Sequence, residues 1–374
     1  MGFSNDFLWI NKNMSGHGQL SIMPVTYANI HNFHYICHNV AQVSHLSGLW
    51  DVTTGTAERG FNMFPGRKCA VMGLGERMTE MLMRLLALQP LKVHYFWGRC
   101  LAWLVSVPMR YRRDVVMINL ARSFPEKKYG ELKDIARDFY RHFGNIVAET
   151  FWFAGSHDTK RLRESHICET VNADMLNRLY NERPGVIVLN SHLGNWELTG
   201  GIMNYIYEPE TVDFGEKTVT VVYKELKNKF WDNVLGDNRC APIAKENSAT
   251  CYVESRNIMR FVIAHKNEKR LYVFPTDQCP YAYASAHTVD DFLHQPTLTM
   301  TGGASLAHKF GFAVVYMAFK EKPGYGYKMT FKEICTDASV MAPEEIMNKF
   351  YRYLEEDIKE QPSNYLWTHK RWKR

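Results

Sequence analysis

After about residue 169 the chain alternates short apolar runs with longer amphipathic stretches. One of the apolar runs, VIVLN, lacks polar alternation, which is typical of a strand buried on both faces of a parallel sheet. All five apolar runs are interpreted as strands. They span residues 186–190, 218–223, 271–275, 313–319 and 327–331. Helical stretches separate and follow them at 171–182, from about 195, at 227–235, 256–266, 299–310 and 343–360. This alternation predicts an α/β fold with a mainly parallel sheet flanked by helices.

Helical spacing also dominates residues 114–153, where Pro125 and Glu126 mark the junction between two predicted helices. In the second helix, apolar side chains recur every three or four residues from Leu132 to Val147. Such a stripe indicates a helix that packs on the core, and we adopt that interpretation.

An aromatic, amphipathic segment precedes these helices at residues 78–113. Lys92, His94 and Arg99 interrupt its apolar run and Pro90 breaks the helix, so we do not expect it to cross a membrane. We favour a helix lying in the membrane interface over one packed on the protein's own core. The apolar side chains expected in the membrane are Trp97, Trp103 and Leu104, and those expected at anionic headgroups are Arg110, Arg112 and Arg113.

The pattern divides the chain into three parts. Residues 1–75 show no sustained period and are interpreted as a poorly specified N-terminal extension, or as the product of a misassigned start site. Residues 76–113 form the interfacial segment, and residues 114–374 form a single α/β domain. A peptide map of the natural N-terminus would test the first boundary.

Composition narrows the function only a little. The net charge of +6 suits anionic lipids, phosphorylated substrates or an acidic carrier protein, but it is too small to indicate nucleic-acid binding. The eight cysteines are scattered without a CxxC pair, which argues against a disulfide scaffold or a zinc site. We expect no metal and no cofactor. Neither a secretory signal pattern nor a long apolar span is present.

The chemistry is predicted at His192, which directly follows the buried strand at 186–190. Ligands of open α/β sheets bind at the carboxyl ends of strands, and histidine is suited to accept a proton near neutral pH. Glu197 follows across a turn, and we expect its carboxylate to hold the second ring nitrogen. No GxSxG nucleophile is present, so the pair would activate a hydroxyl or a water molecule. Alone, this pair is weak support, since a structural histidine at a strand end is equally common.

Several sequence blocks, taken together, resemble the bacterial lipid A biosynthesis (late, or secondary) acyltransferases, within the HxxxxD/E superfamily of glycerolipid-type acyltransferases. The most telling block is HLGNWE, from His192 to Glu197. The other blocks, in the same order as in the family, are RDVVMINLARSFPE from Arg113, Gly144 to Glu149, YKELKN from Tyr223, FPTDQCP from Phe274 and WTHKRWK from Trp367. The resemblance covers about residues 80–374.

This resemblance implies transfer of a fatty acyl chain from acyl carrier protein (acyl-ACP) to a hydroxyl of a lipid A precursor. His192 would be the general base, Glu197 its orienting carboxylate, and the enzyme would work at the cytoplasmic face of the inner membrane as a peripheral or monotopic protein. The alternatives are an acyltransferase for another bacterial lipid, such as an aminolipid or glycolipid, and a thioesterase that uses the same pair on water. A non-enzymatic lipid-binding protein is disfavoured because both residues are present.

Substrate contacts are expected around the same site. Backbone N–H groups near Gly194, at the start of the helix, are candidate donors to the oxyanion, and Asn195 lies beside them. The other predicted substrate-binding residues are Lys224, Lys227, Asp277 and Gln278. The alternatives for these are a solvated basic loop and turn or cap chemistry. Lys224 and Cys279 depart from the Arg and Asp usual in the family, which bears on the acceptor headgroup. The basic residues 370–374 are interpreted as a solvated tail or a membrane contact.

Overall fold

The structure, a computed structural model of the 374-residue chain, describes residues 74–153, 159–225, 251–280 and 286–372. It also describes the single positions Asn228, Asp232, Arg239, Cys240, Ile243, Ala244, Asn247 and Ala284. The predicted N-terminal extension therefore lies outside the described residues, apart from its last two positions. So does most of the helix predicted at 227–235.

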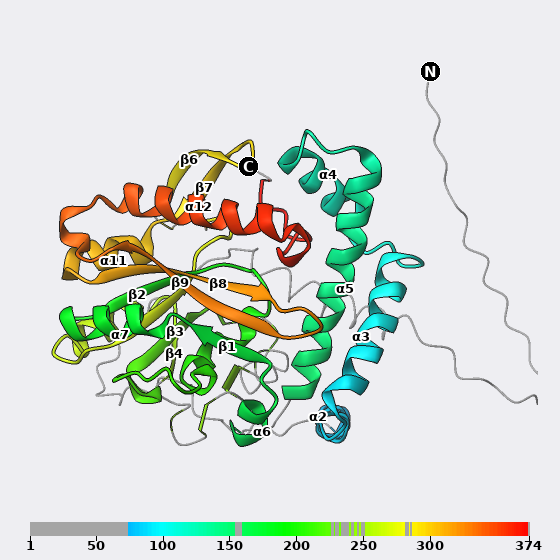
Figure 1. The fold of residues 1–374 in the computed structure, drawn as a ribbon, viewed down its shortest axis with the longest axis horizontal. Helices are drawn as coiled ribbons and strands as arrows, with labels where there is room; N and C mark the ends of the chain where they lie inside the picture. Colours follow the sequence, from blue (N-terminus) through cyan, green and yellow to red (C-terminus); the bar gives the residue numbers. More distant parts are fainter. Residues whose placement is uncertain are drawn as a thin grey trace, which may run out of the picture. The chain divides into compact units, whose positions relative to one another are not determined.

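A mainly parallel sheet lies at the centre of the described chain (Figure 1). Its strand order is β1–β9–β8–β2–β5–β3–β4. The strands are β1 (Cys168–Val171), β2 (Val186–Asn190), β3 (Val219–Tyr223), β4 (Tyr252–Glu254), β5 (Leu271–Pro275), β8 (Ala313–Glu321) and β9 (Tyr327–Cys335). Neighbouring strands run parallel except β8 and β9, which form an antiparallel hairpin. A separate hairpin pairs β6 (Ala286–Phe292) with β7 (Gln295–Met300).

Helices cover both faces of this sheet. The elements that contact its faces are α7 (Ala173–Glu182), η1 (Trp196–Tyr205), α11 (Gly302–Phe310) and α12 (Pro343–Glu360). Figure 1 shows α11 and α12 on one side of the sheet and α7 on the other. Shorter elements in this part of the chain are α6 (Thr159–Glu164), η2 (Glu216–Thr218), α10 (Ile258–Ala264), η3 (Ala338–Val340) and η4 (Pro362–Asn364).

The helices before the sheet form a layer of their own at its edge (Figure 1). They are α2 (Leu74–Ala87), α3 (Leu91–Ser106), α4 (Arg113–Ser123) and α5 (Tyr129–Phe153). Helices α3 and α5 cross where Gly98 meets Gly144, and a Cβ added to Gly98 would lie 2.7 Å from the Gly144 carbonyl oxygen. The two backbones can therefore approach this closely only because both residues are glycine.

Strand β2, which leads into the predicted catalytic stretch, is a central strand of the sheet. All five of its residues are buried, and it pairs with β8 on one side and β5 on the other. A central strand has apolar neighbours on both faces and both edges, which explains its continuous apolar sequence. His192 follows this strand closely, so the sheet fixes the backbone that leads to it.

The predicted α/β fold is confirmed, and the strands that the pattern missed have physical reasons. Strands β1 and β4 are only four and three residues long. Strand β6 carries polar side chains at most positions, so it contains no apolar run. The two helices predicted within residues 114–153 are observed as α4 and α5.

The segment at 78–113 forms helices α2 and α3, which break at Pro90 as predicted. Helix α3 buries one face and exposes large apolar side chains on another, with Trp97 57% and Trp103 62% exposed. None of the described helices is both long and apolar enough to cross a bilayer.

Candidate active site

His192 lies just beyond the carboxyl end of β2, and Asp277 lies just beyond the end of the neighbouring strand β5. The ring Nδ1 of His192 is 2.6 Å from Oδ1 of Asp277, and the backbone N–H of His192 donates to Oδ2 at 3.1 Å. Both residues are buried. One carboxylate therefore fixes the backbone and the ring of the same histidine.

Electrostatics keep Asp277 ionised in spite of its burial. Burial alone would raise its pKa, but the charge of His192, the hydrogen bonds from its ring and backbone, and the charge of Arg371 hold the pKa below its ordinary value. With Asp277 ionised, Nδ1 of His192 is the donor in this contact, so in the neutral ring the lone pair lies on Nε2.

The second ring nitrogen faces an amide. Nε2 of Gln278 lies 2.8 Å from Nε2 of His192, so the Gln278 amide donates to the ring lone pair. Trp196 packs against the imidazole with ring centroids 4.8 Å apart. Nε2 of His192 therefore faces the Gln278 amide, and the Trp196 ring packs beside it.

Glu197 does not contact the ring, contrary to our expectation. Its carboxylate instead accepts hydrogen bonds from Nε of Arg239 at 2.6 Å and from a terminal guanidinium nitrogen at 3.3 Å. Both ring nitrogens of His192 lie against Asp277 and Gln278 instead. The physical reason is that Glu197 opens η1, where its backbone N–H is capped by Asn195 and its side chain meets Arg239. A catalytic role for Glu197 stays a prediction.

The turn at Gly194 is fixed by its surroundings. Gly194 has a φ of +60°, and an added Cβ would lie 2.5 Å from Cβ of Phe319. Its N–H donates to the carbonyl of Asn364 at 3.1 Å. The N–H of Gly194 itself therefore already has a partner in the protein, and the predicted role of the backbone N–H groups near Gly194 as donors to an oxyanion stays a prediction.

Asn195, predicted to bind substrate, is fully buried and bonded within the protein. Its amide donates to Glu149 at 2.7 Å, while its oxygen caps the backbone N–H of Glu197. Hydroxyls of Tyr95 and Tyr327 donate to the same Glu149 carboxylate, at 2.7 and 3.0 Å. Burial raises the pKa of Glu149 to about 7, although these hydrogen bonds partly oppose the shift. Through these hydrogen bonds, Asn195 fixes the turn between β2 and η1 to helix α5.

The remaining predicted residues are only partly accounted for. Lys224 directly follows β3, which pairs with β5, so it lies at the same edge of the sheet as Asp277. It is half-buried, and Lys227 lies outside the described residues. The roles of both lysines in substrate binding stay predictions.

The C-terminal segment packs against the site, a role that the sequence did not lead us to expect. Arg371 is buried rather than solvated; it donates to the hydroxyl of Tyr351 at 2.8 Å and to the carbonyl of Leu298. The hydroxyl of Tyr365 hydrogen-bonds Asp277. The sequence block that begins at Trp367 could have indicated that this segment packs against the site, because the block resembles one that recurs in the family.

Comparison with known proteins identifies the family of the chain. The family model described as "Bacterial lipid A biosynthesis acyltransferase" matches residues 76–374. The chain is 24% identical over 293 residues to the lipid A biosynthesis palmitoleoyltransferase of Escherichia coli (strain K12), covering 76% of this chain and 86% of the relative. A lipid A biosynthesis acyltransferase of Shigella flexneri matches with the same identity and coverage. The match includes every described residue of the site, and the chain belongs to the family of bacterial lipid A biosynthesis acyltransferases.

Proposed function

We propose that this acyltransferase moves a fatty acyl chain from acyl-ACP to a hydroxyl of a lipid A precursor, with His192 as the general base. The observation that carries the proposal is the 2.6 Å contact between Nδ1 of His192 and Asp277. In the neutral imidazole this contact places the proton on Nδ1 and orients the ring, so Nε2 is the nitrogen available to act as a base.

In the proposed step, Nε2 of His192 takes the proton from the acceptor hydroxyl while the hydroxyl oxygen attacks the thioester carbon. A tetrahedral oxyanion forms, and its collapse breaks the C–S bond. The imidazolium returns its proton to the departing thiolate. Asp277 stabilises the imidazolium formed in between, because an ionised carboxylate on Nδ1 favours the charged ring.

The oxyanion needs donors, and Gln278 is the side chain best placed among the described residues. Its amide nitrogen lies 2.8 Å from Nε2 of His192, the atom that would receive the proton. The acceptor hydroxyl would therefore bind next to this amide. When the acceptor hydroxyl takes over the contact with Nε2, the amide becomes available to the developing oxyanion. Removing one such donor typically costs about 3–4 kcal/mol of barrier.

A position at the cytoplasmic face of the inner membrane belongs to the same proposal. Exposed apolar side chains recur along one stripe of α3 and the residue that follows it: Val93, Phe96, Trp97, Trp103, Leu104 and Val107. Exposed tryptophans on an amphipathic helix are typical of membrane interfaces. Replacing Trp97 and Trp103 by Ser should lower binding to phospholipid vesicles; unchanged binding would contradict this location.

The donor and acceptor can be tested together. Purified protein is given acyl-ACP with and without the lipid A precursor, and products are identified by mass spectrometry. We expect acylated lipid only with the precursor, and a loss of about a thousandfold in His192→Ala. Free fatty acid alone would favour the thioesterase, which uses the same histidine on water. Transfer only to an aminolipid or glycolipid would favour the other alternative.

A further inference from the structure

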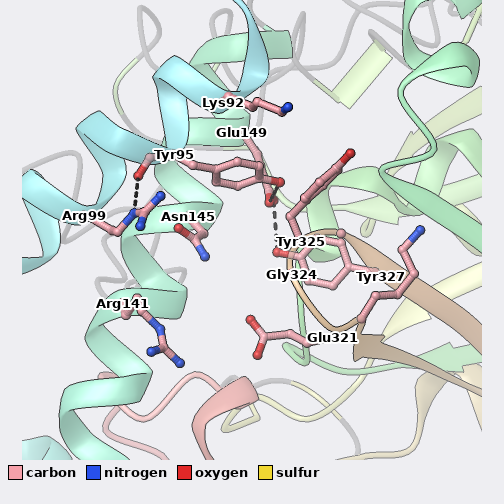
Figure 2. A pocket seen from close by; sticks show the side chains of 12 residues that line it. Lys92, Tyr95, Arg99, Arg141, Asn145, Glu149, Glu321, Gly324, Tyr325 and Tyr327 are labelled. Atoms are coloured by element: carbon pink, nitrogen blue, oxygen red, sulfur yellow. Dashed lines mark hydrogen bonds between the residues drawn. The ribbon is translucent and has the colours of Figure 1, made fainter.

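A polar cavity opens between α3, α5 and the β8–β9 hairpin (Figure 2), and its lining includes Glu149, which hydrogen-bonds Asn195 of the predicted site. Its volume is about 500 Å³. That is within the range of about 300–1,000 Å³ typical of small-molecule sites, and far more than a phosphate alone fills. The side chains that line it include Lys92, Tyr95 and Arg99 from α3 and Arg141, Asn145 and Glu149 from α5.

Three of the basic side chains that line the cavity form no close ion pair with a carboxylate of the described residues. Among the described residues, Lys92 and Arg99 form no ion pair within 4 Å, and the hydrogen bond of Arg99 to the carbonyl of Tyr95 is long, at 3.4 Å. Arg141 has two acidic neighbours but no close ion pair: the carboxylate of Asp138 lies 3.6 Å away, and the charge of Arg141 also lowers the pKa of Glu321 across the cavity. The largely exposed pair with Asp138 contributes little stability. Figure 2 shows Arg99, Arg141 and Asn145 facing the hairpin across the opening.

The acidic side chains of the lining, in contrast, are already occupied. Glu149 receives the hydroxyls of Tyr95 and Tyr327 and the amide of Asn195. Glu321 lies 2.6 Å from the ring of His142. A ligand would therefore meet three basic side chains without close ion pairs and carboxylates that already bind protein donors, which favours an anion with several acceptor oxygens. Arginine forks match phosphate oxygens in pairs, and a phosphate monoester carries about −1.5 to −2 charges at neutral pH.

The location of the cavity indicates where that phosphate comes from. Lys92, Tyr95 and Arg99 lie on α3 beside the exposed apolar stripe that includes Phe96 and Trp97. An amphiphile inserted with that stripe could place its headgroup in the cavity without leaving the membrane. At its floor, Glu149 is bonded to Asn195, three residues beyond His192, so an occupant would lie close behind the catalytic turn.

We infer that this cavity binds the phosphate monoester of a membrane lipid's headgroup. The inference deepens the proposed function and rests on it, since it names a phosphorylated end of the acceptor as the group that the enzyme recognises. The excess volume beyond a phosphate would hold the headgroup that carries it.

The test measures vesicle binding by the full chain rather than activity. Phosphatidylcholine vesicles containing phosphatidic acid, a phosphate monoester, are compared with vesicles of equal surface charge containing phosphatidylglycerol, a diester. We expect tighter binding to phosphatidic acid, lowered about tenfold in Arg99→Gln and in Arg141→Gln. Arg137→Gln is the matched control: it lies one turn from Arg141, is similarly exposed and does not line the cavity. It should bind as the unmodified protein does.

The inference would be overturned if vesicle binding weakened equally in all three variants, or if the protein did not prefer phosphatidic acid. Binding would then depend on the overall charge of the protein and not on this cavity. A second arm titrates inorganic phosphate without lipid. One outcome would assign the cavity to a soluble phosphate: Arg141→Gln weakens the binding of free phosphate but leaves vesicle binding unchanged. That outcome would overturn the inference that the phosphate belongs to a membrane lipid. Because acyl transfer is assayed separately, failure of this inference and failure of the proposed function give different results.

Discussion

The carboxylates of Asp277 and Glu197 both lie near His192, the proposed base, but they bind different partners. Asp277 contacts the ring of His192, whereas Glu197 makes a two-bond ion pair with Arg239. Both side chains of that ion pair are mostly buried, at 9% and 15% exposure. The pair therefore positions η1 behind the catalytic turn.

Replacing Arg239 by Gln should lower the free energy of unfolding by about 3 kcal/mol, because the Glu197 carboxylate would be left without its cation. Denaturant unfolding measures this. The double variant Glu197→Gln/Arg239→Gln should recover part of the loss, since no uncompensated charge remains. If the double variant lost as much stability as the single variants Glu197→Gln and Arg239→Gln added together, the pair would have no structural coupling.

At this scale the sequence predicted which residues gather, but not their pairing. His192, Asp277 and Gln278 were all placed at the ends of buried strands. That β5 is the neighbour of β2 depends on long-range packing, which local spacing does not encode. The role of Arg239 had no local signal, because it lies 42 positions from Glu197.

Among the elements, the crossing of α3 and α5 positions the cavity and the Glu149 network. It depends on Gly98 and Gly144, whose backbones touch. Figure 1 shows these helices side by side at the edge of the sheet.

Gly144→Ala should destabilise the protein by about 1–3 kcal/mol, because the added Cβ would meet the Gly98 backbone. Gly130→Ala in the same helix is the control: its added Cβ meets nothing within 4 Å, so it should gain up to about 1 kcal/mol from helix propensity. Thermal or denaturant unfolding compares the two. Equal effects would contradict a packing role for Gly144.

The elements themselves were largely predictable, since buried parallel strands carry continuous apolar runs and the helices between them keep a regular period. The exceptions are informative. Strand β6 consists mostly of polar residues because it belongs to an isolated hairpin, and η1 begins with a turn that Gly194 and Asn195 enforce through tertiary contacts. Neither feature follows from local hydrophobicity.

In the molecule as a whole, Glu149 joins the helical layer to the sheet. It lies on α5 and receives hydrogen bonds from Tyr95 on α3, Tyr327 on β9 and Asn195 in the catalytic turn. Its pKa of about 7 stands above the ordinary 4.5 because the carboxyl is buried.

This shift makes stability depend on pH. Between about pH 4.5 and 7 the folded protein binds more protons at Glu149 than the unfolded chain does, so stability falls as pH rises through this window. From pH 5 to 8 the loss should be about 2–3 kcal/mol, and Glu149→Gln should not show it. Urea unfolding at both pH values measures the difference. A variant with the same pH dependence as the unmodified protein would contradict a shifted Glu149.

The most direct test of the central claim compares two conservative variants in the acyl-ACP transfer assay. Asp277→Asn keeps the size of the side chain but removes the charge that orients and stabilises the His192 ring. We predict that it lowers kcat by about 10³–10⁴-fold, with both variants checked for intact folding. Glu197→Gln should lower kcat far less, because its carboxylate contacts Arg239 rather than the ring. If Asp277→Asn kept near-full kcat while Glu197→Gln lost it, Glu197 rather than Asp277 would be the catalytic partner of His192.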